Sequence, residues 1–289
     1  MAVGKEILTK IRSVQNTQKI TRAMQMVSTS KMRKTQERMR AARPYAEKVR
    51  TVMSHLAHAN AAETAHPLLV RRAEVKRAGI ILVSSDKGLC GGLNANAFKR
   101  FYAKVRELNE QGVEVDVCCL GQKAVAACHR TRLNMVASAV QLGDLPVMER
   151  LIGPLTVLFK QYAAGEIDAV YLVYTRFVNT MKQEPTLEQL LPLPAEHMVV
   201  EHNHAWDYIY EPDPTSLMEF LVRRYIESVV YQAVAENMAA EQAARMVAMK
   251  SATDNAGNAI KQLRLVYNKS RQTAITTELT EIVAGAAAV

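Results

Sequence analysis

The N-terminal segment, from residue 1 to about residue 59, has the hydrophobic pattern of a helix. It contains no proline before Pro44 and no glycine after Gly4. Ile7, Ile11 and Val14 begin an apolar stripe at spacings of four and three residues. A second stripe, displaced around the helix, consists of Ile20, Met24 and Val27. The seam positions between the stripes are polar: Gln18, Thr21, Gln25 and Ser28. The pattern predicts a helix of roughly 65 Å before Pro44, with a seam more polar than an independent coiled coil requires.

The C-terminal segment predicts a second and longer helix. After Pro214 no proline occurs in the last 75 residues, and Gly257 is the only glycine before Gly285. Asp213 and Pro214 are typical of an N-cap and a first helical turn. The positions that fall on one three/four spacing are Leu217, Leu221, Ser228, Ala235, Met238, Met249, Ala252, Ala259, Leu263 and Val266. Such a helix would be on the order of 100 Å long, so we expect it to pair antiparallel with the first helix and to leave a single-helix tip.

The middle of the chain, about residues 76–200, changes its period. Predicted strands cover 79–84, 113–120, 133–140 and 168–175, and predicted helices cover 97–108, 122–129 and 148–162. Alternating strands and helices favour an open, largely parallel sheet. The predicted fold class is therefore α/β: a long antiparallel coiled coil of the N- and C-terminal helices, residues 1–59 and 213–289, with an inserted Rossmann-like α/β domain at 76–200.

The amino-acid composition is that of a globular protein, and the positive charge of the N-terminal segment suggests a negatively charged partner. Hydrophobic residues make up 49% and charged residues 22% of the chain, as in globular proteins. No apolar run reaches about 18 residues, and the start lacks the apolar core of a signal peptide, so we expect a cytoplasmic location. The net charge is +9, yet residues 1–50 alone hold thirteen Lys or Arg and three Glu. This basic segment is expected to attract an acidic surface, nucleic acid or anionic lipid.

A glycine-rich segment, Ser84–Asn94, is the strongest candidate for ligand chemistry. It follows a predicted strand and precedes a helix, as phosphate-binding loops do. It does not match GxxxxGK[ST], because Leu93 and Asn94 follow Gly92, and it does not match GxGxxG. We interpret the segment as a structural turn that needs left-handed glycines.

The cysteines and histidines give weaker signals. Cys90 has no neighbouring histidine, and only the fold could bring His129 close to it. The chain has four cysteines, Cys90, Cys118, Cys119 and Cys128. They form no CxxC pair, and we expect them to be buried free thiols. The loop histidines His197, His202 and His204 have poor spacing for a metal. We therefore predict no catalytic residue, no cofactor and no metal site.

Three long motifs resemble the gamma subunits of bacterial F-type ATP synthases. The first runs from Ile11 to Met32 and opens with IRSVQNTQKITRAM. The second is the glycine-rich SDKGLCGGLN at 85–94. The third covers most of residues 236–279 and includes EQAARMVAMKSATDNA and YNKSRQTAITTEL. The resemblance covers essentially the whole chain, and its motifs are far longer than the short patterns above.

The resemblance implies a non-catalytic central rotor-stalk subunit of a proton-translocating F-type ATP synthase, an H+-transporting two-sector ATPase. Such a subunit couples rotation of the membrane c ring to ATP synthesis at the beta subunits. Its implied partners are the three alpha and three beta subunits of the catalytic head, the epsilon subunit and the c ring, without nucleic acid. It implies a peripheral location on the cytoplasmic face of the bacterial inner membrane, where the subunit is attached only through the other subunits of the complex. An acidic loop of the beta subunits would give the basic helix its partner.

The same resemblance assigns residues to partners. It implies head contacts by Met24, Arg245, Arg271, Gln272, Thr276 and Glu278, with Met24 opposite Arg245 and Gln272. It implies c-ring contacts by Tyr208 and Glu211, just before the long helix. The small apolar end would be a bearing tip in an apolar sleeve, formed by Ala284, Ala286, Ala287, Ala288 and Val289.

Two other functions fit parts of the sequence. One is an α/β enzyme that uses the Asp86–Asn94 loop, which predicts nucleotide binding by the isolated chain. The other is a nucleic-acid-binding coiled coil, which predicts salt-dependent retention of DNA or RNA by residues 1–50. Neither explains a 75-residue proline-free end with an apolar tip.

Overall fold

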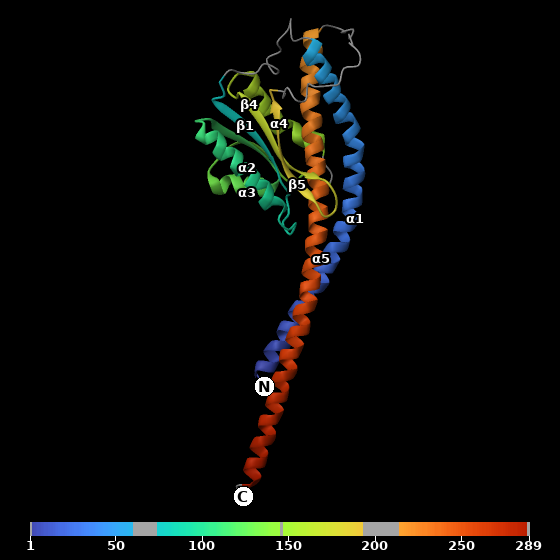
Figure 1. The fold of residues 1–289 in the computed structure, drawn as a ribbon, viewed down its shortest axis with the longest axis vertical. Helices are drawn as coiled ribbons and strands as arrows, with labels where there is room; N and C mark the ends of the chain where they lie inside the picture. The colour runs from blue at the N-terminus through green and yellow to red at the C-terminus, as the bar shows by residue number, and fades with distance from the viewer. Residues whose placement is uncertain (1, 60–73, 145–146, 193–213, 288–289) are drawn as a thin grey trace. The chain divides into compact units, whose positions relative to one another are not determined.

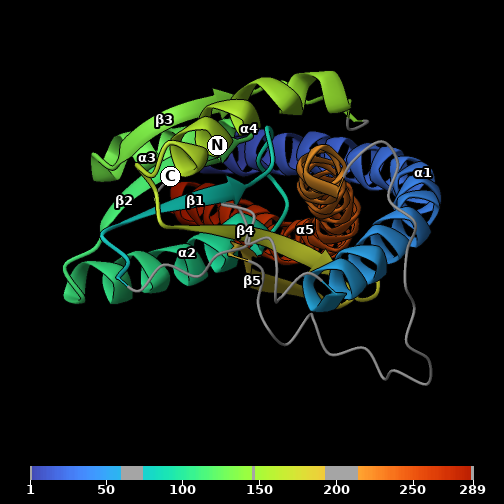
Figure 2. The same cartoon turned by 90° about the horizontal axis from the view of Figure 1, so that it is seen from above.

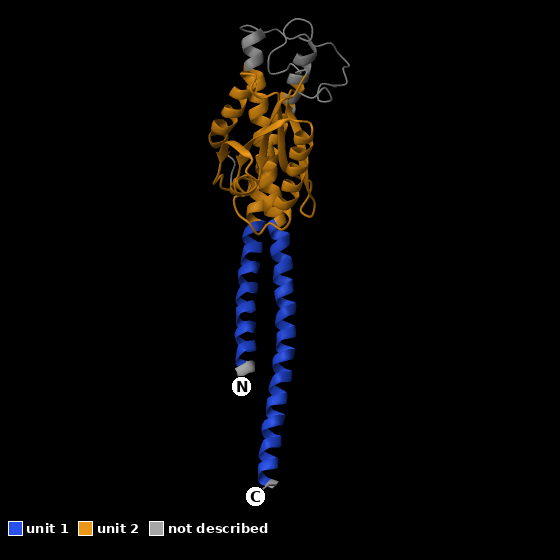
Figure 3. Ribbon diagram, turned by 90° about the vertical axis from the view of Figure 1, so that its left-hand side faces the viewer, with its two compact units in different colours: residues 1–29, 245–289 blue, residues 30–244 orange. Residues whose placement is uncertain are grey.

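A computed structural model describes residues 2–59, 74–144, 147–192 and 214–287 (Figure 1). Its elements in chain order are α1 (Ala2–Ala59), β1 (Arg77–Val83), α2 (Leu93–Glu110), β2 (Glu114–Leu120), α3 (Gln122–Thr131), β3 (Asn134–Ala139), α4 (Met148–Ala163), β4 (Ala169–Phe177), β5 (Gln183–Leu191) and α5 (Pro214–Ala287). The chain forms two compact units, residues 1–29 with 245–289, and residues 30–244 (Figure 3). Both α1 and α5 contribute residues to each unit.

Five strands form the sheet of the 30–244 unit, in the order β3-β2-β1-β4-β5. The pairs β1–β2, β1–β4 and β2–β3 are parallel, whereas β5 is antiparallel to β4. The chain reverses its direction of winding between β1 and β4, and open α/β sheets commonly bind ligands at the carboxyl ends of the strands at such a point. The predicted open, largely parallel sheet is confirmed.

Helices cover both faces of this sheet (Figure 2). On one face, Phe101 of α2 packs with Ile80 and its neighbours in a buried cluster that also includes α3. On the other face, Leu155 of α4 and Val230 of α5 pack with Ile81. Ile80 and Ile81 point to opposite faces because side chains alternate along a strand. The long helix α5 therefore helps to bury the second face of the sheet together with α4.

The edge strand β5 has no counterpart in the sequence-based assignment. Its sequence, QEPTLEQLL, lacks apolar alternation and contains Pro185, which pairs opposite Thr175 of β4. Proline cannot donate a ladder hydrogen bond, so it is tolerated in edge strands and disfavoured in central ones. The edge position explains both the polar composition and the missed strand.

In the unit formed by residues 1–29 and 245–289, α1 and α5 lie side by side and antiparallel (Figure 3). The hydroxyls of Thr21 and Thr253 are 2.8 Å apart, and the side-chain amide of Gln18 donates to the Thr253 carbonyl at 3.3 Å. Ile20 and Val27 are 60% and 54% exposed. The predicted polar seam is thus confirmed, and Ile20 and Val27 of the second apolar stripe lie outside it, whereas Met24 is half-buried.

The α5 side of this seam departs from the predicted spacing toward its C-terminal end. Ala256 and Ile260 are buried and Tyr267 is half-buried, whereas Val266 is 54% exposed. A helix of 3.6 residues per turn drifts away from a strict seven-residue repeat. The assignment of Val266 to the seam was therefore wrong by one residue.

Within the described ranges, no helix combines the length and apolar composition that a membrane span requires.

Candidate functional site

The glycine-rich loop after β1 satisfies its polar groups internally. The Ser85 hydroxyl donates to the Lys87 carbonyl at 2.7 Å, and the Asn94 side-chain amide donates to the Ser85 hydroxyl at 2.7 Å. The Asn94 side-chain oxygen also accepts from the Ser85 backbone N–H at 3.2 Å. Ser85 is buried and Asn94 is half-buried. These groups hold the turn and are not directed at a ligand.

Asp86 in the same loop acts as an internal anion. Its Oδ1 accepts from the backbone N–H groups of Gln122 at 3.0 Å and Gln141 at 3.1 Å, and its Oδ2 accepts from Leu142 at 2.8 Å. Gln122 is the first residue of α3, and a helix N-terminus favours negative charge. The carboxylate therefore occupies the position that an external anion would take at α3, and it links the loops that follow three strands.

Replacing Asp86 by asparagine should lower the free energy of unfolding by about 1–3 kcal/mol. The amide NH2 would face at least one backbone N–H that now donates to a carboxylate oxygen, leaving that donor without an acceptor. Denaturant unfolding of the full chain measures the change. Asp144→Asn is the matched control, because Asp144 is 53% exposed and its ion pair with Lys31 should contribute under about 1 kcal/mol. Equal losses in the two variants would contradict the role of Asp86.

Helix α5 fills the place where a ligand of an α/β sheet would bind. Cys90 and Leu93, at the carboxyl end of β1, form a buried cluster with Ala240 and Ala244 of α5. Phe177, the last residue of β4, packs against this cluster. It also packs against a second cluster, which consists of Met39, Ala235 and Ala239. The alanines let the helix approach the strand ends closely, so the switch point between β1 and β4 is an internal seam between sheet and helix.

Cys90 is a packing residue in this seam. It is 2% exposed, and in the described part of the chain its Sγ contacts the Asn94 side-chain amide at 3.3 Å and the Ser85 hydroxyl at 3.8 Å. No base activates it there, and His129 lies exposed on α3. All four cysteines are buried free thiols, as predicted. Burial raises the pKa of the Cys118 thiol to about 12, which disfavours the reactive thiolate.

No group of three or more potential metal ligands occurs among the residues that the structure describes. His197, His202 and His204 lie outside those residues. The described residues at the carboxyl ends of β1 and β4 are covered by α5, which packs there through Ala240 and Ala244.

Comparison with known proteins agrees with this geometry. Residues 4–289 match the ATP synthase family. The chain is 82% identical over 289 residues to the ATP synthase gamma chain of Chromobacterium violaceum, and the match covers all of both chains. The chain belongs to the ATP synthase gamma family. The gamma chains of Neisseria meningitidis serogroup C and Laribacter hongkongensis are 67% and 64% identical to it over the full length.

Solved structures give the same fold. A chain of the Tetrahymena thermophila mitochondrial ATP synthase central stalk and c ring is 25% identical, with a TM-score of 0.60, and covers 81% of this chain and 99% of its own length. A chain of the Euglena gracilis mitochondrial ATP synthase rotor has a TM-score of 0.66 at 20% identity, covering 95% of this chain and 99% of its own, and supports the fold alone. The predicted family and fold class are confirmed. A gamma chain is a rotor subunit and not the catalytic subunit of the synthase.

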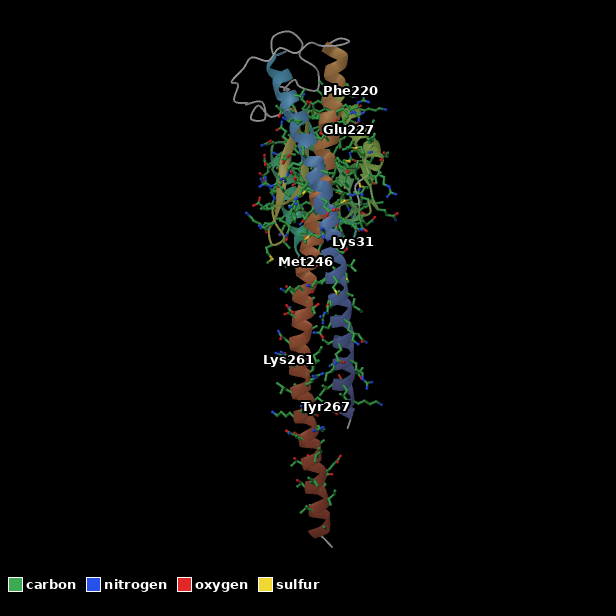
Figure 4. The ribbon with its side chains drawn as sticks, turned by 90° about the vertical axis from the view of Figure 1, so that its right-hand side faces the viewer. Lys31, Phe220, Glu227, Met246, Lys261 and Tyr267 are labelled. Carbon is green, nitrogen blue, oxygen red and sulfur yellow. The ribbon has the colours of Figure 1, made fainter. Side chains whose placement is uncertain are left out.

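The predicted head-contact residues differ in their accessibility. Met24 is half-buried and Arg245 is 7% exposed. Exposed positions on α5 hold Arg271, Gln272, Thr276 and Glu278, and the Thr276 hydroxyl donates to the Gln272 carbonyl at 2.9 Å. Lys261 and Tyr267, labelled in Figure 4, lie on α5 before this stretch.

The helix register separates two of the residues that were expected together. Thr21 contacts Thr253, so the antiparallel pairing brings Met24 to the level of about residue 250. Gln272 lies about 22 residues beyond that level on the same helix, or about 33 Å along its axis at 1.5 Å per residue. The expectation that Met24 lies opposite Gln272 was therefore wrong.

The remaining predicted contacts concern the ends of α5. Tyr208, Glu211, Ala288 and Val289 lie outside the described residues. Ala284 and Ala286 are exposed, and Ala287 is the last residue of the helix.

Proposed function

We propose that this gamma chain is the shaft that carries rotation from the membrane c ring of a proton-translocating F-type ATP synthase to the beta subunits that make ATP. The observation that carries the proposal is the double role of α5. This helix packs on the sheet in the 30–244 unit and pairs with α1 in the other unit. A turning force on the α/β domain would therefore reach the helix pair through one continuous helix.

The work of such a subunit is conformational coupling. The shaft must contact the possible states of the catalytic head with different free energies, because a partner with equal affinity for all states shifts none of them. The exposed apolar side chains Ile20 and Val27 on α1 give the helix pair a surface that differs from one side to the other. This difference supports a role in which rotation presents successive faces to the beta subunits.

We propose that the catalytic head contacts the exposed part of α5 and the adjoining stretch in which α5 pairs with α1. The proposed contact residues are Met24, Arg245, Arg271, Gln272, Thr276 and Glu278. Three large apolar residues near the end of α5, Leu279, Ile282 and Val283, are 58–67% exposed, and exposed apolar surface commonly marks an interface. They support a bearing tip from Ala284 to Val289 seated in an apolar sleeve. Tyr208 and Glu211 stay proposed contacts of the c ring.

The segments 1–59, 76–200 and 213–289 would act as first shaft helix, inserted domain and second shaft helix. Alpha, beta and epsilon subunits and the c ring are the proposed partners. The gamma chains that this chain matches belong to a membrane-associated complex. We place the chain on the cytoplasmic face of the bacterial inner membrane, as a peripheral component of that complex.

Co-purification of the tagged chain from its native cells tests the function. Recovery of one copy of this chain with three alpha and three beta subunits and epsilon is the expected result. Recovery of the chain alone, or with nucleic acid, would contradict the rotor proposal.

Deleting the last few residues, Ala284–Val289, should weaken assembly only modestly. The side chains there are small and apolar, so each buries little surface in a sleeve, at about 25 cal/mol per Å². The yield of complex and its ATP hydrolysis measure the effect. Complete loss of assembly would show that the tip does more than act as a bearing.

A further inference from the structure

Glu236 of α5 is a carboxylate held almost out of contact with solvent. Its side chain is 2% exposed, and a charged residue is rarely buried this far unless it is paired. The Arg43 guanidinium of α1 lies 3.5 Å from its Oε1, and the Gln232 side-chain amide donates to the same oxygen at 3.1 Å. Its Oε2 has no hydrogen-bond partner within the described part of the chain. Arg43 therefore compensates the Glu236 charge by direct ion pairing.

Glu236 also has a charged neighbour on the sheet side. The Glu184 hydrogen bond first, and the Glu236 carboxylate more weakly, raise the pKa of the Arg176 guanidinium of β4. Met39 of α1 packs with Ala235 and Ala239 of α5 in a small buried cluster one turn away. On the sheet side, burial and the carboxylates of Glu188 and Glu236 together raise the pKa of the Tyr174 hydroxyl, so Glu236 faces β4 as well as α1. Arg43 is itself 44% exposed, so it brings its charge to Glu236 from the solvent side.

Close to the ion pair, the apolar contacts between α1 and α5 are made by small or flexible side chains, whereas Val49 and Val52 of α1 pack further along against the large core cluster. Buried positions of α1 hold small or flexible side chains, such as Thr35, Met39 and Ala46. The facing part of α5 is rich in buried alanine, including Ala235 and Ala239. Small side chains give shallow knobs, so these alanine contacts hold one helix along the other only weakly. A single polar residue in a helix seam can specify register at some cost in stability.

We propose that the Arg43–Glu236 ion pair sets the register of α1 on α5 in the 30–244 unit. A shift by one heptad would carry Arg43 about 10 Å away from Glu236, at 1.5 Å per residue, and leave the buried carboxylate without this ion pair. The native register is thus the one that neutralises Glu236. In a rotating shaft, the same pair resists sliding of one helix along the other under load. This consequence rests on the proposed function, whereas the register assignment does not.

Cysteine cross-linking in the assembled complex measures the register directly. Met39→Cys with Ala235→Cys reports the native register, and Met39→Cys with Gln242→Cys reports a slip of one heptad. In the Arg43→Ala background we expect the native cross-link to fall roughly twofold and the slipped one to appear, because the ion pair no longer distinguishes the two registers. Arg43→Lys, which keeps the charge, should restore most of the native cross-link.

Arg40→Ala is the matched control, since it removes the same charge from an exposed position on the same helix. Glu236→Gln keeps the shape of the side chain and removes its charge, so it tests the proposal even if Arg43→Ala fails to assemble. Glu236→Gln should likewise yield the slipped cross-link. Unchanged cross-linking in both Arg43→Ala and Glu236→Gln would overturn the register assignment.

ATP synthesis relative to ATP hydrolysis, measured on the same complexes, separates the two proposals. A slipped register with reduced synthesis supports both of them. A slipped register with unchanged synthesis supports the register assignment and counts against a load-bearing shaft. Reduced synthesis with the native cross-link intact contradicts the register assignment and leaves the rotor function standing.

Discussion

Replacing Gly121 by alanine is expected to lower the free energy of unfolding by about 3 kcal/mol or more. Gly121 has φ 106° and ψ 146°, a backbone region that residues with a Cβ atom essentially do not adopt. A Cβ there would lie 2.4 Å from the Ser84 carbonyl oxygen and 2.7 Å from the Ser84 hydroxyl. Ser84 cannot move away freely, because its N–H donates to Leu120 and its hydroxyl accepts from Ala124, each at 2.8 Å.

Denaturant unfolding of the full chain, followed by circular dichroism, measures this loss. Gly88→Ala is the matched control from the same end of the sheet, because its Cβ would meet only the flexible Lys123 side chain at 3.8 Å. We expect the Gly88 variant to stay within about 0.5 kcal/mol of the native chain. Similar stabilities for the two variants would show that the β2–α3 turn can relax in a way that its hydrogen bonds do not suggest.

The sequence pattern predicted four strands and missed β5, whose buried residues are Leu190 and Leu191 at its end. The runs that became β1 and β2 are almost wholly buried, so their apolar character is continuous and visible. Strand β5 is half-buried along most of its length and contains Pro185, so no two-residue period marks it. Its position comes from pairing with β4, and such a tertiary effect leaves little trace in the local sequence.

The helix pair shows a different limit. Hydrophobicity alone would put Ile20 and Val27 in the seam, yet both are exposed, while Thr21 and Ser28 are buried. A partner in a larger complex can require apolar residues on the outside of a helix pair. The pattern had already placed Thr21 and Ser28 at seam positions, and the resemblance to a known family adds that other subunits would surround the helix pair.

The joint between sheet and helix could not be predicted from the sequence. Asp86 was visible as a polar residue after a strand, but its three acceptor bonds come from loops far along the chain. Phe177 and the alanines of α5 are ordinary apolar residues when they are read in order. Their role depends on the crossing of α5 over the switch point of the sheet, which is a property of the assembled fold.

Ala240→Leu should be the substitution that most directly loosens this joint. Ala240 has no exposed surface and packs with Cys90, Leu93 and Phe177. Three added carbon atoms have no space there, so the strand ends must move away from α5, at a cost of about 1–3 kcal/mol in stability. Because the proposed torque passes through this seam, we also expect ATP-driven proton pumping by the reconstituted complex to fall more than ATP hydrolysis.

The matched control is Ala103→Leu, the same change at an exposed position of α2. It should leave both the unfolding temperature and the ratio of pumping to hydrolysis unchanged, because the larger side chain projects into solvent. A loss of stability in Ala240→Leu without a change in that ratio would mean that rotation bypasses the seam. The α/β domain would then transmit no force through its contact with α5, and the load would have to enter the helix pair elsewhere on the chain.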